Sequence, residues 1–264
     1  MRYLKILYAQ LYIGIKRLSV NKLFLLSFLV NSGGSIIVLL LFPLLLSYGL
    51  GASVSKEYWG VTLLLSIAWS TIFSGSRRML KILPHFKESR MIEEYLMVYP
   101  DISVFLVGEA LLNQLFTLIA IVPPLVVISL LLVNIDPLTL LLYFLALIET
   151  LFVDLGFGVL LAALSWRREL AGTVDAFIIV ATYLCGFLVP VDVFPEYLKI
   201  IALLIPWTYC STSIRSILYG HYHLASIYLL LLPLLGLTLL ALGNWLMKSQ
   251  VEAAKRRGDL TISL

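Results

Sequence analysis

The chain has 264 residues, of which 61% are hydrophobic and only 13% charged, and its formal net charge is +4. Soluble globular domains are about 45–50% apolar and roughly 25% charged, so this composition argues against a water-soluble enzyme. The mean hydropathy is +1.01, and the apolar residues fall in long blocks. These features predict an all-α, polytopic membrane protein with one transmembrane domain over residues 1–264.

The first segment, residues 1–22, precedes any block long enough to cross a membrane. Its apolar residues recur along one face of a helix: Leu4, Leu7, Leu11, Ile15 and Leu18. Basic residues lie off that face, which favours an amphipathic helix lying along the membrane surface. The alternative is an N-terminal extension of the first membrane span.

Six blocks are long enough to cross a hydrocarbon layer of about 30 Å, which takes roughly 20 helical residues. They cover residues 23–50, 58–76, 104–133, 137–164, 171–190 and 224–247. The lysines and arginines divide unevenly across these spans, with sixteen on the side of the two chain ends and three on the other. By the positive-inside rule, both termini and the tail 248–264 lie in the cytoplasm, and the protein lies in the cytoplasmic membrane.

Between the second and third spans, the cytoplasmic loop 77–103 contains a short charged helix. We expect this helix over residues 87–96, because Pro100 and Asp101 stop a helix. It is either a solvated connector or a docking surface for a partner. Its combination of charged residues with Met91 and Tyr95 favours the docking surface.

The external segment 191–223 holds no block long enough to span the membrane. Two prolines, Pro195 and Pro206, bracket an apolar run of only six residues, 200–205. This pattern predicts a short re-entrant helix pair. We expect its aromatic residues, Tyr197, Trp207 and Tyr209, near the membrane interface.

Several polar residues lie inside the predicted spans: Glu109, Asn113, Glu149, Asp154 and Asp175. A carboxylate at such depth costs at least ~2.5–3.5 kcal/mol, so these groups should face the bundle or a water-filled cavity. Glu149, near the middle of its span, is the best candidate for a functional interior group, and a structural interhelical hydrogen bond is the alternative. Glu149 and Asp154 lie about 140° apart on a helix, which argues against a paired acid and base.

Motifs for cofactor chemistry are missing from the sequence. There is no G-x-x-x-x-G-K-[ST] loop, so the chain does not itself hold ATP in the usual manner. There is no H-E-x-x-H or C-x-x-C pair, and His221 and His223 fit a solvated turn better than a metal site. We therefore expect no cofactor in this chain and no nucleic-acid partner.

The most specific pattern in the sequence lies between residues 186 and 220. It reads GFLVP from Gly186, PEYL from Pro195, PWTY from Pro206 and RSILYG from Arg215. Together with the amphipathic first segment, the six spans and the charged loop, it resembles the type-2 ABC transporter permeases over nearly the whole chain. One departure is that a glycine often seen in the family's coupling segment is replaced by Met91 or Ile92.

The resemblance implies a permease that works with a second permease copy or a paralogue in membrane lipid, and with two separate ABC ATPase subunits. Those ATPases would hold ATP and magnesium. The resemblance assigns five residues to the coupling helix: Lys87, Arg90, Met91, Glu93 and Glu94. It assigns six to an external gate hairpin: Gly186, Pro190, Pro195, Pro206, Trp207 and Arg215. The implied substrate is hydrophobic or amphipathic, such as a drug, lipid, glycolipid or peptide.

Two other functions are left open by the sequence. An ion-coupled secondary transporter would use Glu149 and Asp154 as a proton relay, although the inverted repeats of many such folds are not evident. A membrane-embedded enzyme that modifies lipid would need a catalytic motif, and none is found.

Overall fold

The computed structural model describes most of the chain after residue 55. The described residues are 56–88, 91–98, 101–131, 135–166 and 168–257, together with Tyr8, Ala9, Tyr12 and Lys16. Apart from those four isolated positions, the predicted amphipathic helix and the predicted first span lie outside the described residues. Arg90 and the last residues of the predicted tail also lie outside them.

The described part of the chain is all-helical, as the composition predicts. Its elements are α3 (Lys56–Glu88), α4 (Met91–Val98), α5 (Ile102–Leu131), α6 (Pro137–Leu164), α7 (Arg168–Leu184), the 3-10 helix η1 (Val191–Val193), α8 (Glu196–Leu203), α9 (Pro206–Leu218) and α10 (Tyr222–Arg257).

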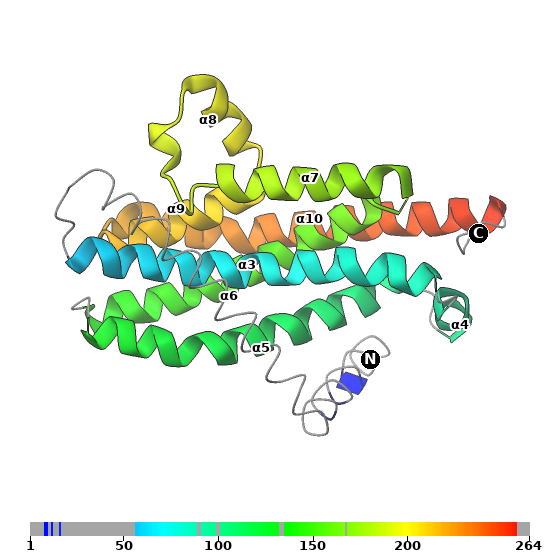
Figure 1. Ribbon diagram of the computed structural model, residues 1–264, viewed down its shortest axis with the longest axis horizontal. Coiled ribbons are helices and arrows are strands. Elements are labelled where there is room, and N and C mark those ends of the chain that lie inside the picture. Colours follow the sequence, from blue (N-terminus) through cyan, green and yellow to red (C-terminus); the bar gives the residue numbers. More distant parts are fainter. Residues whose placement is uncertain are drawn as a thin grey trace.

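Four long helices, α3, α5, α6 and α10, run along the same axis (Figure 1). The central one is α6, which packs against α3, α5, α9 and α10. Small residues bring α6 and α10 together, because a Cβ on Gly156 would lie only 2.6 Å from the carbonyl oxygen of Gly236. Glycines at such contacts let two membrane helices approach closely without a hydrophobic driving force.

Within the described residues, three helices are long and apolar enough to cross a membrane. They are Ile102–Pro123 within α5, all of α6, and α10. A fourth crossing is formed if α8 and α9 count as one bent span. The fourth predicted span, 137–164, has the bounds of α6 itself. The sixth predicted span, 224–247, lies within α10, which stays helical into the expected tail as far as Arg257.

At one end of the bundle, α4 lies across the axis, near the C-terminal end of α10 (Figure 1). The predicted loop 77–103 is largely helical, because α3 continues to Glu88 and α4 begins only at Met91. The continuation has a packing reason: Met79, Leu83 and Phe86 keep a helical spacing and remain buried. Lys87 therefore belongs to α3, and its assignment to the short charged helix is wrong.

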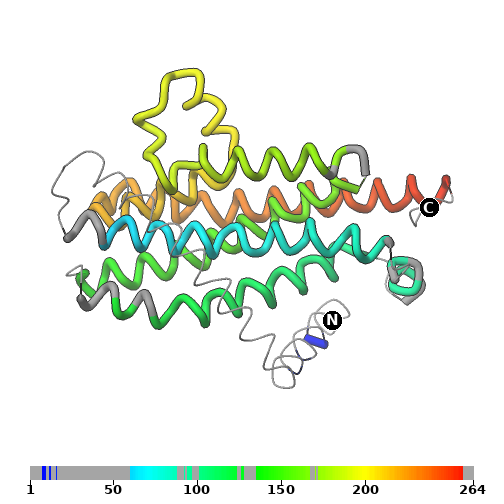
Figure 2. The backbone as a smooth tube through the Cα atoms, viewed as in Figure 1, coloured from blue at the N-terminus to red at the C-terminus, as the bar shows by residue number. Residues whose placement is uncertain are grey.

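The chain after α7 leaves the bundle and returns to it (Figure 2). The predicted fifth span, 171–190, is too long, since α7 ends at Leu184. The chain then forms η1 and α8, and α9 follows at an angle of 101° to α8, the geometry of a broken span or a re-entrant loop. Most of α9 is buried, so this part of the predicted external segment is a bundle helix.

Candidate functional site

The carboxylate of Asp154, on α6, is 0% exposed and lies among three other helices. Oδ2 accepts hydrogen bonds from the backbone N–H of Ser76 on α3 at 3.0 Å and from Nε2 of Gln114 on α5 at 2.9 Å. Oδ1 accepts a bond from Nε1 of Trp207 on α9 at 3.2 Å. A buried carboxylate without partners is strongly unfavourable, and these donors offset its desolvation. One side chain thus connects four helices.

Trp207 reaches this carboxylate from the first turn of α9. Its ring is 0% exposed and packs edge-on against Phe73 and Phe157, with centroids 4.4 Å and 4.8 Å apart. Trp207 is predicted near the membrane interface, and the structure shows that its ring is enclosed by helices of the bundle. An interfacial tryptophan keeps its N–H in contact with water, whereas a buried one needs an acceptor, and here Asp154 supplies it.

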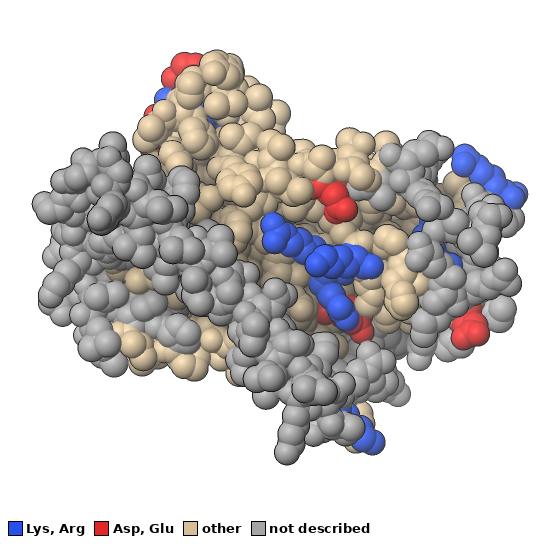
Figure 3. All heavy atoms as spheres, viewed as in Figure 1, with Lys and Arg blue, Asp and Glu red and all other residues tan. Residues whose placement is uncertain are grey.

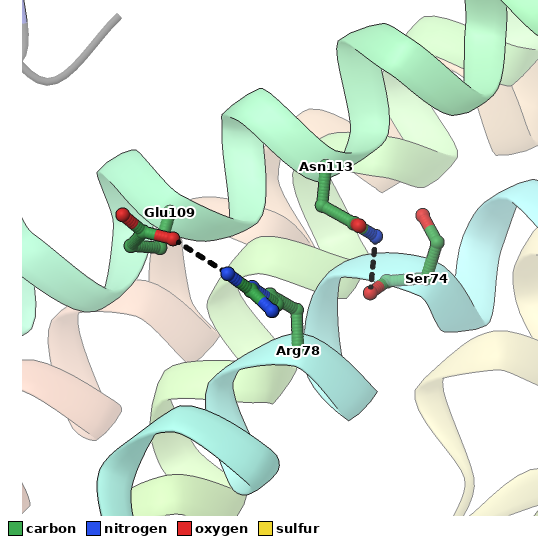
Figure 4. A network of polar contacts seen from close by, with 4 residues as sticks. All are labelled: Ser74, Arg78, Glu109 and Asn113. Carbon is green, nitrogen blue, oxygen red and sulfur yellow. Dashed lines mark hydrogen bonds and ion pairs between the residues drawn. The ribbon is translucent and has the colours of Figure 1, made fainter. Parts of the chain in front are cut away.

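Two further polar contacts join α3 and α5 (Figure 4). Arg78 pairs with Glu109 at 3.1 Å, and the Glu109 side chain is only 14% exposed. Nδ2 of Asn113 donates to the backbone oxygen of Ser74 at 2.9 Å. Glu109 and Asn113 thus face the bundle, as expected of polar groups in a span, and they fasten α5 to α3.

The remaining two predicted carboxylates do not join these contacts. Glu149 is half-buried, and its buried Oε2 has no hydrogen-bond partner in the part of the chain that the structure describes. Asp175 is exposed on α7, so of the two expected surroundings, the bundle and a water-filled cavity, the single chain does not provide the first. The fully buried and multiply bonded carboxylate is Asp154, rather than Glu149, which the sequence favours.

The loop between α7 and η1 is held by the predicted gate residues Gly186 and Arg215. Gly186 has a φ of +86°, in the left-handed region that favours glycine. Arg215, on α9, donates from Nε to the carbonyl oxygen of Gly186 and from a terminal guanidinium nitrogen to that of Phe187, both at 2.9 Å. Arg215 therefore fixes the path by which the chain leaves α7.

Each proline of the predicted gate hairpin lies at the start of a helix. Pro190 precedes η1, Pro195 precedes α8, and Pro206 is the first residue of α9. Proline suits such starts because its fixed φ is preorganised for a helix and its missing N–H has no partner there. The structure thus brings Gly186 and Arg215 together, while the prolines set the ends of the short helices.

At the other end of the bundle, aromatic rings hold α4 against α3 and α5. Phe86 of α3 stacks on Phe105 of α5, with centroids 4.4 Å apart. Tyr95 of α4 contacts both rings, with centroids 5.9 Å and 5.2 Å away. Glu94 is exposed on the same short helix. The predicted docking helix is therefore attached to two bundle helices and presents a charged side chain outward.

Lys87 and Lys248 tie neighbouring helices together at this end. Nζ of Lys87 donates to the backbone oxygen of Trp166 at 2.7 Å and lies 4.4 Å from the centroid of its ring. Lys248 of α10 pairs at 3.1 Å with Asp101, whose side chain is 7% exposed. The sequence predicts Asp101 only as a helix stop. Its ion pair with Lys248 could not be predicted, because the two residues are 147 positions apart and no local pattern connects them.

Figure 3 shows Lys and Arg side chains gathered on one face of the bundle, with acidic side chains near them. On α3, the basic residues Arg77 and Lys81 are exposed. The guanidinium of Arg77 lies 6.0 Å and 5.9 Å from the ring centroids of Trp69 and Phe73. A guanidinium at this distance from an aromatic ring is attracted to the face of the ring electrostatically.

Comparison with known proteins identifies the family of the chain. No curated protein matches the chain. A family model described as ABC-2 type transporter matches residues 10–219, which is most of the sequence and includes the Asp154 contacts, α4 and the loop after α7. This chain is thus a multi-pass membrane protein and a transport subunit, and it belongs to the ABC-2 type transporter family.

Proposed function

We propose that this chain is the permease subunit of an ATP-driven exporter that moves a hydrophobic or amphipathic substrate outward across the cytoplasmic membrane. The energy would come from two separate ATPase subunits that hold ATP and magnesium. The observation that carries this proposal is the attachment of α4, through Phe86, Tyr95 and Phe105, to the ends of two bundle helices. A short helix fixed in this way can transmit a movement of the ATPase subunits to both bundle helices.

The charges at the α4 end support a cytoplasmic position for it. Lys248, Lys255, Arg256 and Arg257 all lie in the last part of α10, at the same end as α4. Basic residues concentrate on the cytoplasmic side of membrane proteins. In this orientation α4 meets the ATPases, and the α8 hairpin lies toward the outside.

The mechanism follows from this orientation. Closure of the ATPase dimer would push α4, and α3 and α5 would tilt with it as rigid helices. A route would open between two permease copies, with the α8 hairpin controlling exit. Leucine, isoleucine, valine and phenylalanine dominate the spans, which suits an apolar portion of the substrate.

Charge reversal on α4 tests this proposal. We expect the exposed carboxylate of Glu94 to face a basic residue of the ATPase. Glu94→Lys would place like charges across that interface, which costs several kcal/mol, and should weaken copurification of the ATPase subunits with the chain by at least about tenfold. ATP hydrolysis by the complex should fall with it. Glu196→Lys makes the same charge change on an exposed residue of α8, which lies toward the outside in this orientation, and should leave both quantities close to those of the parent.

Unchanged ATPase binding and hydrolysis in Glu94→Lys would show that α4 is not the docking element. Transport that continues without any ATPase, and stops when the proton gradient is collapsed, would favour an ion-coupled transporter instead. Activity of the purified chain on lipid would favour a membrane-embedded enzyme.

A further inference from the structure

Trp207 sits where the re-entrant segment joins the bundle. It is the second residue of α9, directly after the 101° bend between α8 and α9. Its N–H donates to Asp154, and its ring lies between Phe73 and Phe157. A movement of the α8 hairpin that carries α9 with it must therefore shift this ring or break its bond to Asp154.

The other oxygen of the same carboxylate contacts the two helices that α4 connects. Oδ2 accepts from Ser76 of α3 and from Gln114 of α5. α3 runs directly toward α4, and α5 starts shortly after it. A tilt of α3 against α5 therefore changes the donors on one oxygen of Asp154, while a shift of α9 changes the donor on the other.

The side chains around Asp154 are densely packed, so a movement of one helix cannot be accommodated without moving its neighbours. Asp154, Gln114 and Trp207 are each at most 1% exposed. Close-packed interiors switch between discrete arrangements rather than deforming gradually. A carboxylate that is buried this deeply loses its hydrogen bonds only at a large cost in free energy. We therefore expect the helices that donate to Asp154 to move together rather than one at a time.

We propose that Asp154 is a positioning residue that links movement of the α8 hairpin to movement of the coupling helix α4. It does so by holding α9, α3 and α5 at fixed positions relative to one another. This inference rests on the proposed function and deepens it. It assigns to a carboxylate inside the bundle the task of making the exit hairpin respond to events at the ATPase end. Asp154 need not touch the substrate to do so.

The test compares two tryptophan variants that each lose one N–H. Trp207→Phe keeps an aromatic ring between Phe73 and Phe157 but removes the donor to Asp154. Trp69→Phe is the matched control, because the N–H of Trp69 donates at 3.3 Å to the backbone oxygen of Thr182 and not to Asp154. Asp154→Asn is the second test variant, since it keeps the side-chain volume but removes the charge.

The readout is the reaction of a reporter cysteine at Val193, which is 71% exposed in η1, with a membrane-impermeant maleimide. The native cysteines, Cys185 and Cys210, are both buried. In the complex with its ATPases, the parent Val193→Cys protein should label at different rates in the nucleotide-free and vanadate-trapped states. That difference should shrink by about tenfold in Trp207→Phe and Asp154→Asn, as expected for loss of a bond to a charged acceptor, and persist in Trp69→Phe.

The outcomes separate this inference from the proposed function. A parent protein without any nucleotide-dependent difference overturns both. A clear difference in the parent that Trp207→Phe and Asp154→Asn both retain overturns the coupling role of Asp154 and leaves the exporter standing.

Amide hydrogen exchange on the chain alone gives a reading that needs no ATPase. If Asp154 joins α9 to α3, Trp207→Phe should accelerate exchange at least about tenfold near Ser76 as well as near residue 207. Trp69→Phe should not affect either region. Faster exchange confined to α9 would contradict the link between the two helices.

Discussion

At Gly75, the backbone of α3 lies so close to two side chains that a residue with a Cβ would clash with them. A Cβ placed on Gly75 would lie 2.5 Å from Oδ2 of Asp154 and closer still to Nε2 of Gln114. This close approach lets the next residue, Ser76, donate its N–H to the carboxylate. Gly75 is therefore part of the Asp154 site although it contributes no functional group.

We predict that Gly75→Ala destabilises the bundle by about 1–3 kcal/mol, the usual range for overpacking a dense core. The inserted methyl group must displace Gln114 or Asp154 from their hydrogen bond. The measurement is the thermal unfolding temperature of the detergent-solubilised protein. Gly172→Ala is the control, because a Cβ at Gly172 meets no atom within 4 Å. Alanine also has a higher helix propensity than glycine, so this variant should not be destabilised. Equal unfolding temperatures for the two variants would contradict the packing argument.

At the scale of the helix, α10 is fastened to its neighbours at both ends. Near its start, the hydroxyl of Tyr222 lies 2.6 Å from Oγ1 of Thr139 in the first turn of α6. Thr139 in turn donates its backbone N–H to Asp136, which caps α6, at 3.0 Å. Near its other end, Lys248 pairs with Asp101. These attachments fasten this helix of 36 residues to α6 at one end and to the residue before α5 at the other.

We predict that acid loosens the Tyr222 end of this helix pair through Asp136. Hydrogen bonds from the side chain and the backbone of Thr139 hold the pKa of Asp136 below its ordinary value of 3.8. The stabilisation from a carboxylate with a lowered pKa is complete above the unfolded value and is lost as the pH falls through the folded value. The unfolding temperature should therefore decline below about pH 4.

Asp136→Asn should make that decline shallower, because the side chain at this position then no longer titrates. Asp192→Asn removes another exposed carboxylate, in η1, and serves as the control. A decline of the same steepness in Asp136→Asn and in the parent would show that the acid response arises elsewhere.

For the whole molecule, sequence reasoning succeeded where a signal is local and failed where it depends on distant residues. The start of α6 follows from Asp136 and Pro137, which together form a strong helix start. The burial of Trp207 could not be predicted, because an aromatic residue between two short helices has the same local pattern at an interface as in a core. Its acceptor, Asp154, lies 53 positions earlier in the chain. No local pattern carries that pairing.

The assembly, unlike the single chain, should bury the outward face of α7. Asp175 is exposed on α7, as are Phe177, Ile179 and Val180, which are 42–56% exposed, and Asp175 and Ile179, four residues apart, share one side of the helix. A carboxylate directed into lipid costs at least ~2.5–3.5 kcal/mol, so we expect a second copy of the chain to cover it. Because a two-fold interface brings the same patch from both copies together, residue 175 of each should lie near its counterpart.

We therefore predict that Asp175→Cys forms a cross-linked dimer when the membranes are treated with a mild oxidant. Leu230→Cys is the control, since Leu230 is 80% exposed on α10, away from the predicted interface, and should stay monomeric under the same treatment. The measurement is non-reducing gel electrophoresis of the membranes. Cross-linking through residue 230 but not through residue 175 would place the partner against α10. The route between two copies would then have to be sought there.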